Sequence, residues 1–363
     1  MRKTLVLMLA VASLVLGCAS RVPVSTMPSS PATAEPVPPT SEPMPSAVTP
    51  SPTLVAMPRG TVDPDIYVDI YDVDKAWAGT TIFPDNHNSE RPRIIEVNML
   101  GEIIWEYLVP QDLKQYTNPG FDVEMLPNGN ILFVLPRNGI CEIDRSGKVV
   151  WSYLTAEVSH DADRLPSGNT LFVFGAEDQK SSAQVREINS KGETVWAWYA
   201  RDYFDKSPYA DIYLEGWTHT NAVTRLESGN AIISLRNFGF VVEVDPKGAV
   251  VRTIGEGALR NQHDPEPLPG EVLLLADHSE PQRAAEISLK TGEVIWEFAL
   301  QRQLVRDANR LPNGNTLITG GTALVEVTRE GEVVWQLRLR QVIEREQASG
   351  QGFYKAERIG SNR

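Results

Sequence analysis

The stretch Ser159–Leu171, SHDADRLPSGNTL, decides the fold because the chain repeats it with small changes. The other copies are TNPGFDVEMLPNGNIL at Thr117–Leu132, THTNAVTRLESGNAI at Thr218–Ile232, QHDPEPLPGEVL at Gln262–Leu273 and VRDANRLPNGNTL at Val305–Leu317. Each copy joins a short alternating segment to a Gly-containing turn, which is the pattern of a β-hairpin. The repeated stretch therefore predicts one strand and one hairpin turn per copy.

A second signature follows most copies, an alternating run that ends in glycine and then tryptophan. It reads QVREINSKGETVW at Gln184–Trp196, AAEISLKTGEVIW at Ala284–Trp296 and LVEVTREGEVVW at Leu324–Trp335. A repeat of about forty to sixty residues built from short alternating strands is typical of a β-propeller blade. We expect each tryptophan to fill the wedge between neighbouring blades, because a large ring suits that space.

The number of blades follows from counting the two halves of the repeat. The tryptophan half occurs at Trp105, Trp151, Trp196, Trp296 and Trp335, with a degenerate sixth copy at Gly248–Ile254. The other half occurs five times, and the tail FYKAERIGSN at Phe353–Asn362 aligns with Arg306–Asn315 as the sixth. The first blade starts without its inner strand, near Thr80. The sequence therefore predicts an all-β, six-bladed propeller that the C-terminal strand closes, which removes exposed sheet edges.

The N-terminus is typical of an exported protein. Arg2 and Lys3 precede an apolar run at Leu5–Leu16, and Gly17 then stands before Cys18. This run predicts a signal peptide, and Gly-Cys at its end resembles a bacterial lipobox whose cysteine is lipidated. The alternative is an ordinary secretory signal that happens to contain Cys18. We expect a protein outside the cytoplasm that is anchored by lipid to a bacterial membrane.

Composition divides the rest of the chain. Residues 1–18 are the predicted signal peptide, and residues 19–60 hold 11 of the 26 prolines, which predicts a disordered tether. Residues 61–363 form the predicted propeller. The net charge of −13 without a basic cluster argues against nucleic acid and against anionic lipid as partners, so the membrane contact is through the lipid anchor alone. Cys141 has no second cysteine in the mature chain and is interpreted as a buried apolar residue.

One position of the repeat collects unusual side chains. Stepping back five residues from the Leu or Ile of each inner strand reaches Tyr354, Phe121, His160, Asn221, His263 and Arg306. By symmetry these six side chains should lie at one height and face the channel, and His219, two residues before Asn221, should face the same side. Asp161, Asp264 and Asp307 directly follow ring positions, so we expect them to point away from the channel as turn or inter-blade residues.

The loops at the same end of the predicted channel add cationic and aromatic residues. Arg236 follows an inner strand, and the long connection Tyr199–Trp217 is rich in aromatic residues up to Trp217. Aromatic loops over a cationic mouth suit a flat aromatic ligand that carries an anion. The alternative is that these aromatics pack the insertion onto the blades. His87 and His278 lie in polar loops and are interpreted as solvated residues.

These residues resemble the bacterial arylsulfate sulfotransferases, six-bladed propellers of the cell envelope. The resemblance rests on Trp217-Thr-His219-Thr-Asn221, on Ser234-Leu-Arg236 and on Gln262-His263-Asp264. It implies that His219, Asn221 and Arg236 bind a sulfuryl group, that His263 carries it covalently and that His160 assists. Arg306, Tyr354, Phe121 and Trp217 are then the candidate contacts of the aryl sulfate or phenol. No cofactor is implied.

Three alternatives remain at this point. The first is a non-catalytic propeller of the cell envelope that binds an anionic or aromatic ligand or a protein partner. The second is a quinone-cofactor dehydrogenase, but those propellers have more blades and a carboxylate-rich calcium site. The third is a zinc site built from the three histidines. An arginine among those histidines would repel a cation, so we predict no metal.

Overall fold

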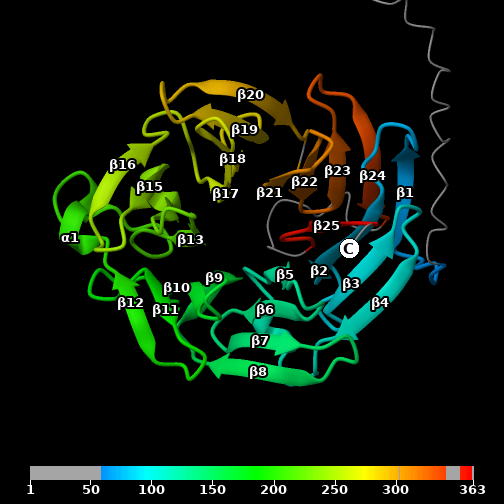
Figure 1. Ribbon diagram of the computed structural model, residues 1–363, viewed down its shortest axis with the longest axis horizontal. Helices are drawn as coiled ribbons and strands as arrows, with labels where there is room; N and C mark the ends of the chain where they lie inside the picture. The colour runs from blue at the N-terminus through cyan, green and yellow to red at the C-terminus, as the bar shows by residue number, and fades with distance from the viewer. Residues whose placement is uncertain (1–58, 302, 341–351, 362–363) are drawn as a thin grey trace, which may run out of the picture. The chain divides into compact units, whose positions relative to one another are not determined.

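The computed structural model describes residues 59–301, 303–340 and 352–361 of the chain. Within them almost every regular element is a strand, and six sheets stand around a ring as blades (Figure 1). The ring belongs to the compact unit Leu54–Arg363. The predicted six-bladed propeller is therefore confirmed.

Each blade is an antiparallel sheet of consecutive strands, listed here from the inside outward. The first is β25 (Glu357–Gly360), β2 (Gly79–Asp85), β3 (Arg93–Asn98) and β4 (Ile103–Leu108); the second is β5 (Val123–Met125), β6 (Ile131–Leu135), β7 (Gly139–Ile143) and β8 (Val149–Leu154). The third is β9 (Val158–Arg164), β10 (Thr170–Phe174), β11 (Val185–Ile188) and β12 (Thr194–Trp198); the fourth is β13 (Thr220–Arg225), β14 (Ala231–Leu235), β15 (Phe240–Val244) and β16 (Val250–Ile254). The fifth is β17 (His263–Leu268), β18 (Val272–Asp277), β19 (Arg283–Ser288) and β20 (Val294–Ala299); the sixth is β21 (Val305–Arg310), β22 (Thr316–Gly320), β23 (Ala323–Val327) and β24 (Val333–Leu339).

The C-terminal segment closes the ring as predicted. β25 pairs antiparallel with β2, with Thr80 opposite Ile359, and an isolated bridge joins Asp85 to Phe353. The Phe353 side chain is fully buried and meets the Phe83 ring edge-on at 4.8 Å. The innermost strand of the first blade thus comes from the opposite end of the chain to its other three strands.

The sixth blade carries a fifth strand that the repeat does not predict. β1 (Ile66–Tyr71) pairs antiparallel with the outer strand β24, with Ile66 opposite Leu339 and Tyr71 opposite Trp335. Most residues of β24 are buried, whereas the other outer strands alternate between exposed and half-buried positions. A covering strand is what such an apolar edge needs.

The tryptophans of the outer strands bridge neighbouring blades, as the repeat predicts. The indole N–H of Trp105 donates to the Arg145 carbonyl at 2.8 Å, and that of Trp335 donates to the Met99 carbonyl at 2.9 Å. Trp151 and Trp296 make the same bond to the next blade. These residues stabilise the ring and have no part in chemistry.

The described residues contain no helix that is long and apolar enough to cross a membrane. Cys18 and the predicted signal peptide and tether up to residue 58 lie outside the described residues. Cys141 is buried in the core, and burial raises the pKa of its thiol to about 11, so it is the inert apolar residue that was expected.

Candidate functional site

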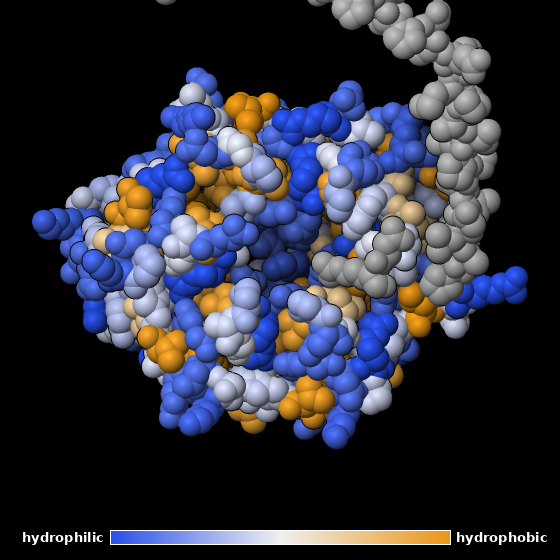
Figure 2. Space-filling model, viewed as in Figure 1, coloured by the Kyte–Doolittle hydropathy of each residue, from blue (hydrophilic) through white to orange (hydrophobic). Residues whose placement is uncertain are grey.

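The inner strands of the blades enclose a polar pocket in the middle of the ring. Figure 2 shows this centre hollowed and lined by hydrophilic residues. We call it the axial pocket, and its volume is about 10 Å³, enough for one water molecule. Its lining residues come from all six blades and are Asp122, His160, Asp161, Asn221, His263, Asp264, Arg306 and Tyr354.

Five of the six predicted ring positions meet in the axial pocket, and the sixth does not. Phe121 is 1% exposed and packs in the apolar core, with its ring 6.4 Å from that of Phe133. The next residue, Asp122, lines the pocket instead. The expectation that Phe121 faces the channel is wrong, because the inner strands do not keep a strict alternation at this height.

Irregularities in the inner strands explain the change. Pairing slips between His263 and Glu266 in β17 and between Val305 and Asp307 in β21. His160 has φ +50° and Asp264 has φ +46°, a left-handed conformation that non-glycine residues seldom adopt. A bulge turns consecutive residues toward the same side. The prediction that Asp161 and Asp264 point away from the channel is therefore wrong, since both line the pocket.

Some of these aspartates do join blades, as predicted. Asp161 Oδ2 accepts from the Val223 N–H of the next blade at 2.7 Å, and Asp307 Oδ2 accepts from the Ala356 N–H at 3.2 Å. Asp122 Oδ2 accepts in the same way from the Ala162 N–H at 3.3 Å. The carboxylates thus fix the spacing of the inner strands that carry the site.

His263 is held in one tautomer. Its Nδ1 lies 2.9 Å from the Asn261 carbonyl oxygen, which can only accept, so Nδ1 carries the proton and Nε2 keeps its lone pair. Burial, and then the charges of His278 and Arg236, hold the pKa of His263 well below its usual range. His263 is therefore a neutral imidazole at pH 7, with a free lone pair at Nε2.

His278 belongs to the site, although the sequence indicated a solvated loop residue. Its ring stacks on His263 with the centroids 4.6 Å apart and an interplanar angle of 25°. Its Nε2 lies 2.7 Å from the Val305 carbonyl oxygen, which fixes its orientation. Burial lowers the pKa of His278 to about 4. The solvated interpretation is wrong, and nothing in the polar loop around His278 signals the stack.

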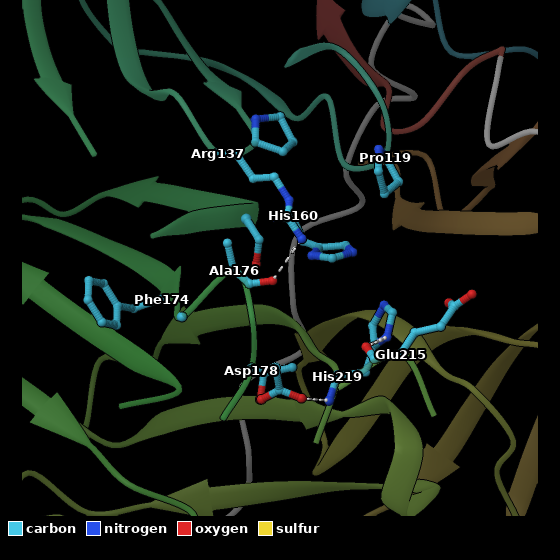
Figure 3. Close-up of a pocket in the computed structure, with 12 residues that line it drawn as sticks. Pro119, Arg137, His160, Phe174, Ala176, Asp178, Glu215 and His219 are labelled. Carbon is cyan, nitrogen blue, oxygen red and sulfur yellow. Dashed lines mark hydrogen bonds between the residues drawn. The ribbon is translucent and has the colours of Figure 1, made fainter. Parts of the chain in front are cut away.

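A second pocket opens beside the axial one. We call it the side pocket: it has a volume of about 180 Å³, and His160, His219, Phe174, Arg137 and Glu215 are among the residues around it (Figure 3). The rings of His160 and His219 meet edge-on at 5.1 Å. His160 lines both pockets, so a ligand that fills the side pocket reaches the axial one at this residue.

The backbone of His219 is fixed by Asp178, a residue that the sequence did not indicate. Asp178 Oδ2 accepts from the His219 N–H at 2.5 Å, and its Oδ1 accepts from the Thr218 hydroxyl at 2.7 Å. Gly216 permits this approach, because a Cβ there would stand 2.7 Å from Asp178 Oδ2 and the residue has φ +111°. Burial, and then the charge of Arg236, lowers the pKa of His219 to about 4.

Arg236 is the cation that the four clustered histidines share. It lies in the 3-10 helix η3 (Arg236–Phe238) directly after β14. Its charge contributes to the lowered pKa of His160, His219, His263 and His278. Among the described residues no carboxylate forms an ion pair with Arg236. The site therefore has a strong preference for an anion.

Asn221 and Arg306 complete the axial pocket. Asn221 donates one amide N–H to the Gln262 carbonyl at 2.9 Å, which leaves its second N–H for a ligand. Arg306 is largely buried, and its guanidinium lies 5.6 Å from the centre of the Tyr354 ring. Burial lowers the pKa of Arg306 and raises that of Tyr354 above its usual range.

The aromatic insertion does not cover the mouth with Trp217. That side chain is 1% exposed, its indole N–H donates to the Tyr209 carbonyl at 2.8 Å, and it packs with Phe204 and Phe238. Trp217 lies outside both pockets. The alternative, in which these aromatics pack the insertion onto the blades, is the correct one for Trp217.

His87 is also not solvated, and it lies away from both pockets. Its Nδ1 is 2.5 Å from Asp85 Oδ1; burial disfavours the charged form, but this bond outweighs burial and raises the pKa of His87. In the part of the chain that the structure describes, no group of three or more His, Cys, Asp or Glu residues could hold a metal ion.

Comparison with known proteins places this geometry in a family. The family model described as Arylsulfotransferase (ASST) matches residues 58–263, more than half of the chain. This protein is a member of the arylsulfotransferase family, and the match includes His160, His219, Arg236 and His263. No curated protein matches the chain.

Solved structures resemble the chain in fold alone. A protein of unknown function from Bacteroides caccae is 19% identical, with 77% of this chain and 98% of that chain covered and a TM-score of 0.54. A virginiamycin B lyase from Staphylococcus aureus is 14% identical over 61% and 71% of the two chains, with a TM-score of 0.42. BamB from Moraxella catarrhalis is 13% identical over 73% and 74%, with a TM-score of 0.39. Identities this low carry no information on activity.

Proposed function

We propose that this protein moves a sulfuryl group from an aryl sulfate to a phenol through a sulfo-histidine formed at His263. The observation that carries the proposal is the fixed tautomer of His263, whose Nδ1–H is bound to the Asn261 carbonyl while Nε2 keeps its lone pair. A neutral imidazole is a nucleophile that needs no prior deprotonation. Membership of the arylsulfotransferase family supports the same class of reaction.

In the first step the Nε2 lone pair of His263 attacks the sulfur of the donor. The N–S bond forms as the bond between sulfur and the phenolic oxygen breaks, and its electron pair leaves on the phenolate. Arg236 and the free N–H of Asn221 would stabilise the charge on the transferring oxygens. The sulfated ring becomes cationic, and its Nδ1–H then makes a stronger bond to the Asn261 carbonyl.

The second step reverses the first with a different phenol. The acceptor oxygen attacks sulfur, the N–S bond breaks, and its electron pair returns to Nε2 of His263. A neighbouring histidine, His160 or His219, takes the acceptor proton. In the first step the same histidine gives a proton to the leaving phenolate, because the bound anion raises its pKa above the value of the empty site.

The side pocket offers the place for the aryl group. Pro119, Pro136 and Phe174 supply apolar surface there, and His160 and His219 border it. A phenyl ring in this space would direct its sulfate toward the axial pocket at His160. Flat apolar walls with a few polar groups at one end are typical of a site for a small aromatic ligand.

The test is a transfer assay on the purified protein. We expect nitrophenol release from 4-nitrophenyl sulfate only when a phenol acceptor is present, with ping-pong kinetics, because the sulfo-histidine must form before the acceptor reacts. Parallel initial-rate lines at several acceptor concentrations would support the proposal. A folded protein that is inert with several donors and acceptors would contradict it, and the site would then be a binding pocket for an aromatic anion.

We also propose that the protein is a lipoprotein anchored through Cys18 outside the cytoplasm. The support is the apolar run Leu5–Leu16 followed by Gly17 and Cys18. Cells supplied with radioactive palmitate should label the wild-type chain and not Cys18→Ser, because only the thiol can carry the diacylglycerol. Equal labelling of both chains would remove this proposal.

A further inference from the structure

A lysine lies at the bottom of the axial pocket, and the repeat pattern gave it no role. Lys355 follows Tyr354 in the closing segment, and its Nζ lies 3.4 Å from Asp122 Oδ1, 3.3 Å from Asp161 Oδ1 and 3.4 Å from Asp264 Oδ2. These carboxylates belong to the second, third and fifth blades. One ammonium group thus joins residues from across the ring.

The three carboxylates also line the pocket that contains the proposed nucleophile. Asp122, Asp161 and Asp264 share the axial pocket with His263 and Arg306. Two of them cannot turn away, because Asp122 Oδ2 and Asp161 Oδ2 each accept a backbone N–H of the neighbouring blade. Three carboxylates in the wall of an anion site would repel the ligand that the site is built to hold.

We propose that Lys355 is a positioning residue that neutralises these carboxylates and thereby allows the axial pocket to accept the sulfuryl end of an aryl anion. The Lys355 side chain is only 19% exposed, so water screens its charge poorly. It does not replace Arg236 as a contact of the anion. Its role is to offset the charge of the pocket floor, and the inference rests on the proposed anion site but not on the transfer chemistry.

The role of Lys355 has a defined pH dependence. The acidic groups that sense its charge are Asp122, Asp161, Asp163, Asp264, Asp307, Glu124 and Glu266. The groups that face the anion from above are His160, His219, His263, His278, Arg236, Arg306 and Tyr354. Without Lys355 the carboxylates stay charged at high pH and repel the ligand. At low pH they take up protons and the repulsion falls, so the effect of the lysine should be large at pH 8 and small at pH 5.5.

The experiment measures binding of 4-nitrobenzenesulfonate to the full chain by calorimetry. This probe has a C–S bond and cannot donate its sulfuryl group, so its affinity is independent of turnover. We expect Lys355→Met to weaken binding by roughly tenfold or more at pH 8 and by much less at pH 5.5. Lys355→Arg should bind almost as well as the wild type, because the charge is kept.

A second variant tests the same idea without touching the lysine. Asp264→Asn removes one carboxylate and suits the left-handed backbone at this position, which asparagine tolerates. It should tighten binding at pH 8 by a few-fold, on the scale of removing one nearby like charge. In the double variant with Lys355→Met it should restore part of the lost affinity. This variant decides the question even if Lys355→Met does not fold.

Several outcomes would overturn the inference. These are a folded Lys355→Met variant with wild-type affinity at pH 8, an equal loss at both pH values, or no gain of affinity in Asp264→Asn. A wild type that does not bind the sulfonate at either pH would also overturn it, even if the transfer assay succeeds. A wild type that binds in the expected way but transfers nothing would leave the role of Lys355 standing and remove the proposed reaction.

Discussion

Replacing His263 by alanine should abolish the transfer of sulfuryl groups, with a loss in kcat of at least ~10³-fold. The reason is that the variant has no atom that can carry the group between donor and acceptor. Removing a covalent nucleophile eliminates the intermediate, whereas removing one binding contact only raises a barrier. The pocket itself should survive, because the backbone of β17 is held by its pairing with β18.

Two measurements separate loss of the nucleophile from damage to the fold. Added imidazole should restore part of the rate in His263→Ala by occupying the space that the side chain leaves. Intact mass after mixing with donor alone should show a sulfuryl adduct on the wild type and none on the variant. Tyr213→Ala is the matched control, since this mouth residue is 77% exposed and should change nothing. Normal turnover in His263→Ala would contradict the proposed role.

The architecture could be predicted from the sequence because the hydrophobic pattern repeats with the chain. The tryptophan half of the repeat and the Leu-Pro-x-Gly-Asn half each mark one place in a blade, so the missing copy indicated closure by the tail at Phe353–Asn362. β1 could not be predicted in this way, because it lies outside the repeat. Its partner carried a weak signal: Gln336 in β24 stands where β4 and β20 have Glu106 and Glu297 after the tryptophan.

The candidate site was predicted in its membership but less well in its orientation. Symmetry brought His160, Asn221, His263, Arg306 and Tyr354 to one height, and the structure places all five around the axial pocket. Strict alternation failed where the inner strands bulge, because a bulge turns the next residue to the same side. For that reason Asp122 and Asp161 line the pocket and Phe121 does not.

The residues that the sequence missed depend on contacts between distant segments. The stack of His278 on His263 joins the inner end of β17 to the loop after β18, and the bonds of Lys355 join the tail to three other blades. Neither pair follows from residue type or spacing within one strand. A polar loop and a lysine after a ring position both have a solvated interpretation in the sequence, and only the closed ring changes it.

Removal of the closing segment should have the largest effect on stability. Deleting Phe353–Arg363 takes away β25, and β2 then becomes an exposed edge. It also removes Phe353 from the core and breaks the fully buried ion pair between Arg358 and Glu326 at 3.0 Å, which joins the first blade to the sixth. Loss of a buried aromatic costs about 3–5 kcal/mol, and an unpaired buried carboxylate costs a similar amount.

These losses are comparable with the whole stability of a typical domain, about 5–15 kcal/mol. We therefore expect the truncated chain to unfold at least ~10 °C below the full chain, since each kcal/mol shifts the midpoint of a large domain by about 2–4 °C. Thermal unfolding followed by circular dichroism gives the measurement, and a chain that lacks only Asn362 and Arg363 is the control for truncation itself. If the truncated and full chains unfold at the same temperature, the tail does not close the ring. The ring closure and the site stand together in this respect, because the same deletion removes Tyr354 and Lys355 from the axial pocket.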